Sequence, residues 1–180
     1  MIGLNQAFRF AACSALLSAV AALAQTPAPA AGPVPPAIPA AKKIFVSNAG
    51  ADAGLFPSPF TGTPDRGYNQ FYAQLKGAGH FELVSDPSDA DLVLELQLLA
   101  HASPLHLTES VNKVNGAADP LPMFRLVVYD RKTHYVLWTM TESIETAYLQ
   151  KTHDRNFDDA LKALLQDFLS IAGKTQSANH

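Results

Sequence analysis

The sequence predicts an α/β protein, an α+β two-layer sandwich whose four- to five-stranded mixed sheet carries two helices on one face. Three observations favour this fold. Several short runs alternate apolar and polar residues, as half-buried strands do. Two longer segments carry apolar residues at spacings of three and four, as amphipathic helices do. Two apolar runs around a short polar turn predict a hairpin, so the order is strand, helix, four strands, helix.

The hairpin is predicted over residues 124–141, with a loop from Asp130 to His134. This loop gives three apolar cross-strand pairs: Val128 with Val136, Leu126 with Trp138 and Phe124 with Met140. The opposite face then carries Arg125, Val127, Tyr129, Tyr135, Leu137 and Thr139. A loop one residue shorter would turn the second strand over and place Trp138 beside Arg125. We prefer the first register because it gathers the largest apolar side chains on one face.

Alternation predicts three further strands, at residues 42–47, 80–84 and 91–99. The first helix is predicted to begin with Thr63 as N-cap and Pro64 as its first helical residue. Gly77 and Gly79 are expected to end it. Its apolar stripe consists of Tyr68, Phe71, Tyr72 and Leu75.

The last helix is predicted to begin with Asn156 as N-cap and to end at Gly173. One face of this helix is apolar throughout. It consists of Phe157, Leu161, Leu164, Leu165, Phe168 and Ile171 or Ala172. Burial of this stripe, at about 1.5–3 kcal/mol per large side chain, is expected to dock the helix on the sheet.

The N-terminal 24 residues are predicted to be a cleaved signal peptide. Arg9 precedes an apolar run, which ends in a small-residue pattern with cleavage after Ala24. A buried Ala-rich helix is the alternative, and retention as an anchor also stays open. Cys13, the only cysteine, lies inside the apolar run and resembles a lipoprotein cleavage site poorly. Loss of Cys13 on cleavage would exclude disulfides and thiolate chemistry from the mature protein.

Composition divides the rest of the chain into three parts. Residues 25–41, rich in proline and alanine, are predicted to be a disordered linker. Residues 42–173 form a single α/β domain, and residues 174–180 a frayed tail. Without Arg9 the chain holds 12 basic and 16 acidic residues, a formal charge of −4. This mildly acidic net charge gives no electrostatic signal for nucleic acid binding. No integral membrane span is expected after cleavage.

Motifs for the common catalytic and metal chemistries are not found in the sequence. The histidines are scattered, with no pair at helical spacing, so solvated or capping roles are expected. Asp86, Asp89 and Asp91 alternate like calcium ligands but lack the glycine and distant glutamate of a calcium loop. We therefore expect turn and strand-entry roles for these carboxylates, and neither a metal nor a cofactor.

Two surfaces are candidates for function. The first is the outer face of the hairpin, with Val127, Tyr129, Tyr135 and Leu137. If uncovered, this face predicts a partner or self-association site. The loop 101–122, or the apolar residues Leu55, Phe56 and Phe60, are the segments that could instead cover it. The second candidate is the loop after the first strand, where Asn48, Asp52 and Arg66 could hold an anionic ligand.

The hairpin also carries a resemblance to bacterial envelope proteins. The shared pattern is Ala90-Asp91 before a strand, a strand ending in Asp130, and Thr133 followed by Leu137-Trp138. It resembles the TolB amino-terminal domain, the CsgG periplasmic domain and outer-membrane activators of penicillin-binding proteins. From Lys42 to about Phe168, the chain is more closely similar to an uncharacterised family of secreted bacterial proteins. Where these relatives usually have glycine, this chain has His134, which would close the hairpin in left-handed geometry.

The resemblance implies the sandwich fold and a non-enzymatic envelope role, and it assigns no functional residue. We therefore expect an exported, periplasmic or secreted protein that binds another envelope protein or itself. The alternative is a small-molecule-binding or hydrolytic periplasmic protein that uses the loop after the first strand. A roomy cleft lined by Asn48, Asp52 and Arg66 would favour this alternative.

Overall fold

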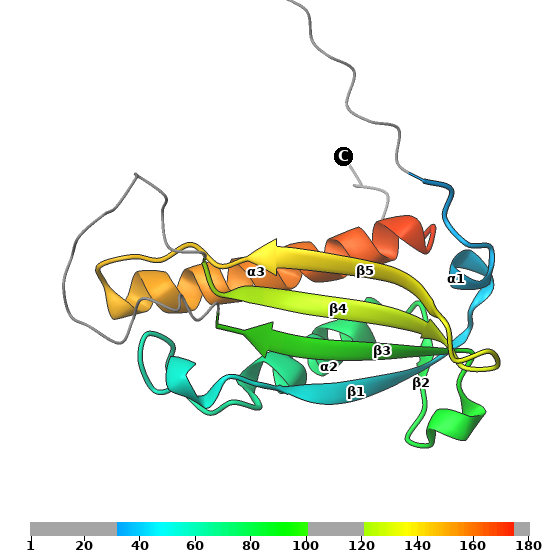
Figure 1. Ribbon diagram of the computed structural model, residues 1–180, viewed down its shortest axis with the longest axis horizontal. Coiled ribbons are helices and arrows are strands. Elements are labelled where there is room, and N and C mark those ends of the chain that lie inside the picture. The colour runs from blue at the N-terminus through cyan, green and yellow to red at the C-terminus, as the bar shows by residue number, and fades with distance from the viewer. Residues whose placement is uncertain (1–31, 101–120, 175–180) are drawn as a thin grey trace, which may run out of the picture. The chain divides into compact units, whose positions relative to one another are not determined.

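The computed structural model describes residues 32–100 and 121–174. The predicted signal peptide, the first part of the predicted linker, most of the 101–122 loop and nearly all of the tail lie outside these residues. Figure 1 shows a single sheet with its helices. The strands are β1 (Lys43–Ala51), β2 (Glu82–Leu83), β3 (Leu92–Leu99), β4 (Met123–Asp130) and β5 (Val136–Ser143). The helices are α1 (Ala37–Ala40), α2 (Arg66–Ala78) and α3 (Gln150–Ile171).

The predicted fold class is confirmed. The sheet has five strands in the order β2-β1-β3-β4-β5, with β1 parallel to β2 and β3, and β4 antiparallel to β3 and β5. The two long helices, α2 and α3, lie on one face of this mixed sheet (Figure 1). The inward-facing residues of β3 are all buried, as the alternating sequence predicts: Leu92, Leu94, Leu96 and Leu98.

The predicted linker is too long at its C-terminal end. Residues 37–40 form the short helix α1, and Ile38 is fully buried in the core together with Ala41. Burial of these two apolar side chains in the core is more favourable in free energy than their exposure in an extended proline-rich chain would be. Asp91 reinforces this entry into the fold, because its carboxylate accepts hydrogen bonds at 2.9 Å from the backbone N–H groups of Lys42 and Lys43. These bonds lower the pKa of Asp91 below its ordinary value.

Both predicted hairpin registers are wrong, because a shorter loop and a β-bulge act together. Asp130 donates its backbone N–H to the carbonyl of Tyr135, so the loop is one residue shorter than the preferred prediction. A β-bulge at Leu137 then inserts a residue into β5. The resulting pairs are Tyr129 with Val136, Val128 with Trp138, Leu126 with Met140 and Phe124 with Glu142. The bulge returns Trp138 to the predicted inner face, while Val136 moves to the outer one.

Both predicted helix starts are displaced. Helix α2 begins at Arg66 with Asp65 as N-cap, and residues 63–65 form a turn instead. Helix α3 begins at Gln150, about two turns before the predicted start. Asn156 lies inside α3 and donates its side-chain N–H to the carbonyl of Glu145. The additional turns are held by a neighbouring loop, because Gln150 bonds to the carbonyl of Pro59. The predicted helix ends are closer, with Gly79 and Gly173 both in left-handed geometry. Gly77, which was also expected to end the first helix, lies inside α2.

An aromatic cluster forms the core between the two long helices and the sheet. The ring of Phe157 on α3 lies 4.9 Å from that of Phe124 on β4 and 5.1 Å from that of Phe60, measured between centroids. Phe56 packs against Phe157 as well, and Leu55 is buried in the same core. The apolar residues of the loop after β1 therefore belong to the helical side of the sheet. They do not cover the outer face of the hairpin.

Two glycines of α2 give a matched test of this packing. A Cβ at Gly67 would lie 2.9 Å from Cε1 of Phe124, whereas a Cβ at Gly77 would meet nothing within 4 Å. Gly67→Ala is therefore expected to lower the free energy of unfolding by about 1–2 kcal/mol through overpacking. Gly77→Ala is expected to raise it by up to about 1 kcal/mol, because alanine loses less entropy in a helix. Urea denaturation of both variants checks this difference, and equal effects would contradict the described packing.

Candidate functional site

The outer face of the sheet, opposite α2 and α3, carries no helix among the described residues (Figure 1). The four positions of the predicted interaction face differ in exposure. Tyr135 is 73% exposed and Tyr129 is half-buried, but Val127 is only 2% exposed. Leu137 is half-buried and packs against the core because of the bulge, so it does not belong to this face. Val127 and Leu137 are therefore not accessible at this face, which retains Tyr129 and Tyr135 and gains the exposed Val136.

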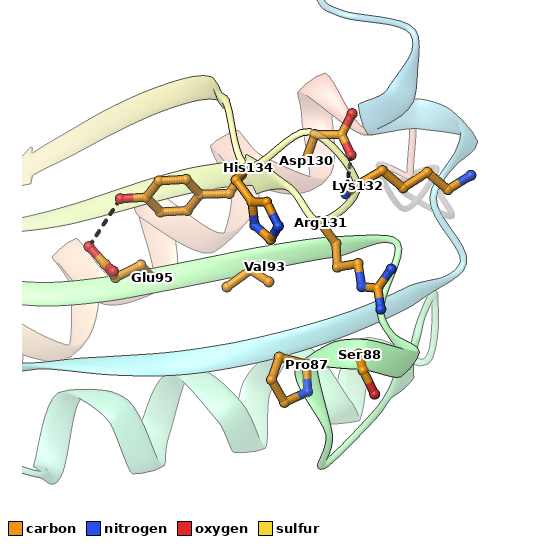
Figure 2. A pocket seen from close by; sticks show the side chains of 9 residues that line it. Pro87, Ser88, Val93, Glu95, Asp130, Arg131, Lys132 and His134 are labelled. Carbon is orange, nitrogen blue, oxygen red and sulfur yellow. Dashed lines mark hydrogen bonds between the residues drawn. The ribbon is translucent and has the colours of Figure 1, made fainter.

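An open pocket of about 660 Å³ lies where the outer face meets the hairpin loop (Figure 2). Its walls come from the turn before β3, from β3 itself and from the end of the hairpin. They are formed by Pro87, Ser88, Val93, Glu95, Tyr129, Asp130, Arg131, Lys132 and His134. Tyr129 is the residue shared by this pocket and the predicted interaction face.

His134 adopts left-handed backbone geometry, with φ of 60°. It is the one residue other than glycine with positive φ in the part of the chain that the structure describes. Its backbone N–H donates to the carbonyl of Asp130 at 2.8 Å, which closes the hairpin turn. The expectation of left-handed geometry at this position is confirmed. A side chain here costs on the order of 1 kcal/mol relative to glycine, and the imidazole that it supplies lies in the pocket.

Both carboxylates of the pocket already have partners. Glu95 accepts a hydrogen bond at 3.4 Å from the Tyr129 hydroxyl. Burial, together with the negative charge of Glu95, raises the pKa of Tyr129. Asp130 accepts a hydrogen bond at 2.8 Å from the backbone N–H of Lys132, and this bond lowers the pKa of Asp130. The two acidic groups therefore stabilise the strands and the turn.

The basic groups of the pocket have no ion-pair partner among the described residues. Figure 2 shows the His134 ring above β3 near Val93, and the Arg131 side chain extending toward Ser88. Lys132 extends away from the others. The pocket thus offers an apolar floor with an imidazole and a guanidinium at its rim, an arrangement that suits a carboxylate beside an apolar group.

The second predicted site does not come together as a cleft. The Asn48 side chain donates to Asp65 at 3.0 Å, and the Asp52 carboxylate accepts from the backbone N–H of Gly54 at 2.8 Å. Arg66 forms ion pairs with Asp154 and Asp158 of α3. The cavity beside Asn48 has a volume of about 10 Å³, room for about one water molecule. The roomy cleft that would favour the alternative function is therefore not formed by these residues.

Two of the three aspartates that mimic calcium ligands, Asp86 and Asp91, have structural roles. Asp86 accepts a hydrogen bond from the backbone N–H of Ser88 at 2.7 Å, while Asp91 holds the start of β1. No group of three or more candidate ligands gathers around a point within residues 32–100 and 121–174. The same residues include no helix whose length and apolar character would allow it to cross a membrane.

Sequence reasoning identified Tyr129 and the geometry of His134 but not the pocket itself. Pro87 and Ser88 precede β3, and the antiparallel pairing of β3 with β4, which sets Leu92 opposite Asp130, brings this turn beside the hairpin loop. The sequence offered one signal, because two cations, Arg131 and Lys132, precede His134 in the same hairpin loop.

Comparison with known proteins assigns no family to the chain. No family model matches the chain, and no curated protein matches it. Protein XCC0632 from Xanthomonas campestris is similar in structure at a TM-score of 0.45 and 13% identity, covering 74% of this chain and 86% of that one. A dodecamer of a PelC variant from Paraburkholderia phytofirmans has a TM-score of 0.40 at 15% identity, covering 75% of this chain and 89% of PelC.

TolB from Acinetobacter baumannii, of the type that the hairpin resembles, is also among the structural neighbours. Its TM-score is 0.40 at 13% identity, and the match covers 74% of this chain and 29% of TolB. At scores below 0.5, these likenesses define neither a function nor a membership for this chain.

Proposed function

We propose that the chain is a non-enzymatic, exported envelope module that binds a protein partner through the pocket at the end of the hairpin. The observation that carries this proposal is His134, a non-glycine residue in left-handed geometry whose side chain lines an open pocket. Backbone conformations that cost stability persist where the side chain has a use, and they cluster at functional sites. The export signal predicted at residues 1–24 supports a periplasmic or secreted location.

The chemistry of the pocket defines the kind of partner. Val93 and Pro87 provide apolar contact, while Arg131 and His134 provide donors for an acidic group. A protein segment with a carboxylate next to an apolar side chain fits this set. A binding role is favoured over a catalytic one because both carboxylates of the pocket, Glu95 and Asp130, already accept hydrogen bonds from Tyr129 and Lys132 and neither is bonded to His134.

His134→Gly tests the proposal, since it removes the imidazole and relieves the backbone. The free energy of unfolding is expected to rise by about 1 kcal/mol in urea denaturation. Partner binding is expected to fall in the same variant. Binding is measured by in-cell photo-cross-linking from a probe at Tyr135, which is exposed beside the pocket.

The matched control is the same probe at Tyr148, a fully exposed aromatic residue beyond the other end of β5. We expect cross-links from position 135 that His134→Gly removes, and no shared adduct from position 148. Identical adducts from 135 in both backgrounds would show that His134 does not contribute to the site.

A further inference from the structure

Within the described residues, the sheet has one long edge strand without a second neighbour, β5. It is the last strand in the order β2-β1-β3-β4-β5, and it spans eight residues. The backbone N–H of Ile144 donates to the carbonyl of Pro122 at 2.7 Å, which fixes the alternation of bonded and non-bonded pairs along β4 and β5. Thr139, Thr141 and Ser143 occupy the non-bonded positions. Their backbone N–H and C=O groups therefore point away from β4 and have no partner within the described part of the chain.

The side chains of this edge favour strand pairing. Thr139, Thr141 and Ser143 are exposed on the outer face, and β-branched and hydroxyl residues form good cross-strand pairs. Natural sheets usually protect an open edge with lysine, proline or a bulge in its middle. Strand β5 contains no lysine and no proline, and its bulge lies at Leu137, near its start.

Glu142 is the one charged residue of β5. Its negative charge determines which kind of incoming strand can pair favourably with this edge. It pairs with Phe124 on the inner face and lies beside Asp167 of α3. Burial, and then the nearby Asp167 carboxylate, raise the pKa of Glu142. A second copy of the chain paired about Thr141 would bring two such acidic pairs onto neighbouring positions, which is unfavourable. An incoming strand with a cation opposite Glu142 would relieve the repulsion instead.

We propose that the open edge of β5 binds an extended peptide segment of another protein, which adds a strand to the sheet and carries lysine or arginine opposite Glu142. The backbone groups of Thr139, Thr141 and Ser143 supply the ladder hydrogen bonds. The position opposite Glu142 is a non-bonded one, where facing side chains are closest. The position opposite Met140, which is half-buried, takes an apolar residue. This surface is separate from the pocket around His134 and does not depend on the function proposed for that pocket.

The test uses a synthetic peptide with the sequence Val-Thr-Lys-Thr-Val-Thr and the full chain, measured by fluorescence anisotropy. One control peptide has glutamate in place of the lysine, and another is N-methylated at the amides that face β5. We expect binding of the first peptide only, with amide NMR shifts at Thr139, Thr141 and Ser143. The glutamate peptide is expected to bind at least about fivefold more weakly.

Variants of the protein give matched controls. Thr141→Pro removes an outward N–H without breaking a bond to β4, and it is expected to weaken binding about tenfold. Thr141→Val retains the N–H and is expected to bind as the wild type does. Glu142→Lys is expected to exchange the preference, so that the glutamate peptide binds better than the lysine peptide. This exchange tests the proposal even if the proline variant does not fold.

Several results would overturn the proposal. Equal binding of the lysine, glutamate and N-methylated peptides would rule out an oriented strand at this edge. Absence of binding at millimolar peptide would do so as well. A dimer of the full chain in light scattering that Thr141→Pro dissociates would assign the edge to a second copy. His134→Gly should leave peptide binding unchanged, which separates this result from the test of the pocket.

Discussion

Phe157→Ala is expected to lower the free energy of unfolding by about 3–5 kcal/mol, the largest effect of any single substitution considered for this fold. Phe157 is fully buried, and its ring lies among those of Phe56, Phe60 and Phe124. It joins α3, the loop after β1 and strand β4, so its removal leaves a cavity that no single element can fill by moving. Urea denaturation monitored by far-UV circular dichroism measures the loss.

Phe157→Leu is the matched control, because it retains most of the apolar volume. We expect it to cost less than half as much as alanine, since the cavity is smaller. A loss below about 1 kcal/mol for Phe157→Ala would contradict the placement of this ring at the centre of the core.

The second large effect is expected at the ion pair between Arg66 and Asp154. The Arg66 side chain is 14% exposed and that of Asp154 is 21% exposed, and the guanidinium carbon lies 4.4 Å from the centroid of Phe157. Asp154 also accepts hydrogen bonds at 3.0 Å from the N–H and the hydroxyl of Thr61. Asp154→Ala leaves the Thr61 donors without this acceptor and removes one of the two ion-pair partners of Arg66, so we expect a loss of about 2 kcal/mol near pH 7.

This loss should depend on pH in a defined direction. Burial raises the pKa of Asp154, but the bonds from Thr61, Arg66 and Gln150 outweigh burial and bring the pKa from 3.8 to about 2. The folded state therefore holds the ionised carboxylate more strongly than the unfolded state does. Its contribution is present above about pH 4 and is lost as the pH falls toward 2. Wild type and Asp154→Ala should accordingly converge in stability over that range.

Glu82→Gln provides the control for a surface ion pair. Lys43 Nζ and Glu82 Oε1 are 3.8 Å apart, with side chains 45% and 65% exposed. Such a pair contributes less than about 0.5 kcal/mol. If Glu82→Gln cost as much as Asp154→Ala, the enclosed network around Arg66 would not explain the effect.

The fold could be predicted from the sequence because its signals are local. Alternation along residues 91–99 and the apolar stripe of α3 each require one buried face, whatever their neighbours are. The predictions that were wrong concern features that depend on contacts between distant segments. Helix α3 starts early because Gln150 and Asp154 bond to a loop about 90 residues earlier in the chain. The hairpin register depends on the bulge at Leu137, for which no local residue is diagnostic.

The same distinction applies to the candidate site. The left-handed geometry of His134 was predictable, because a tight hairpin loop requires it at a fixed place. The pocket was not predictable, since Pro87 and Ser88 reach it only through the pairing of β3 with β4, whose register the local sequence does not specify. Arg66 was predicted to hold a ligand, but its partners Asp154 and Asp158 lie on a helix whose docking the local sequence does not specify.

The other edge strand, β2, limits how many strands can be added to the sheet. It contains two residues, Glu82 and Leu83, paired with Lys43 and Ile44 of β1. An amyloid-like polymer grows because every added chain leaves a fresh unpaired edge for the next one. A chain with one adhesive edge and one edge of two residues can accept a single strand and then has no second edge from which to propagate. We therefore expect this asymmetry to oppose the growth of fibrils through β5.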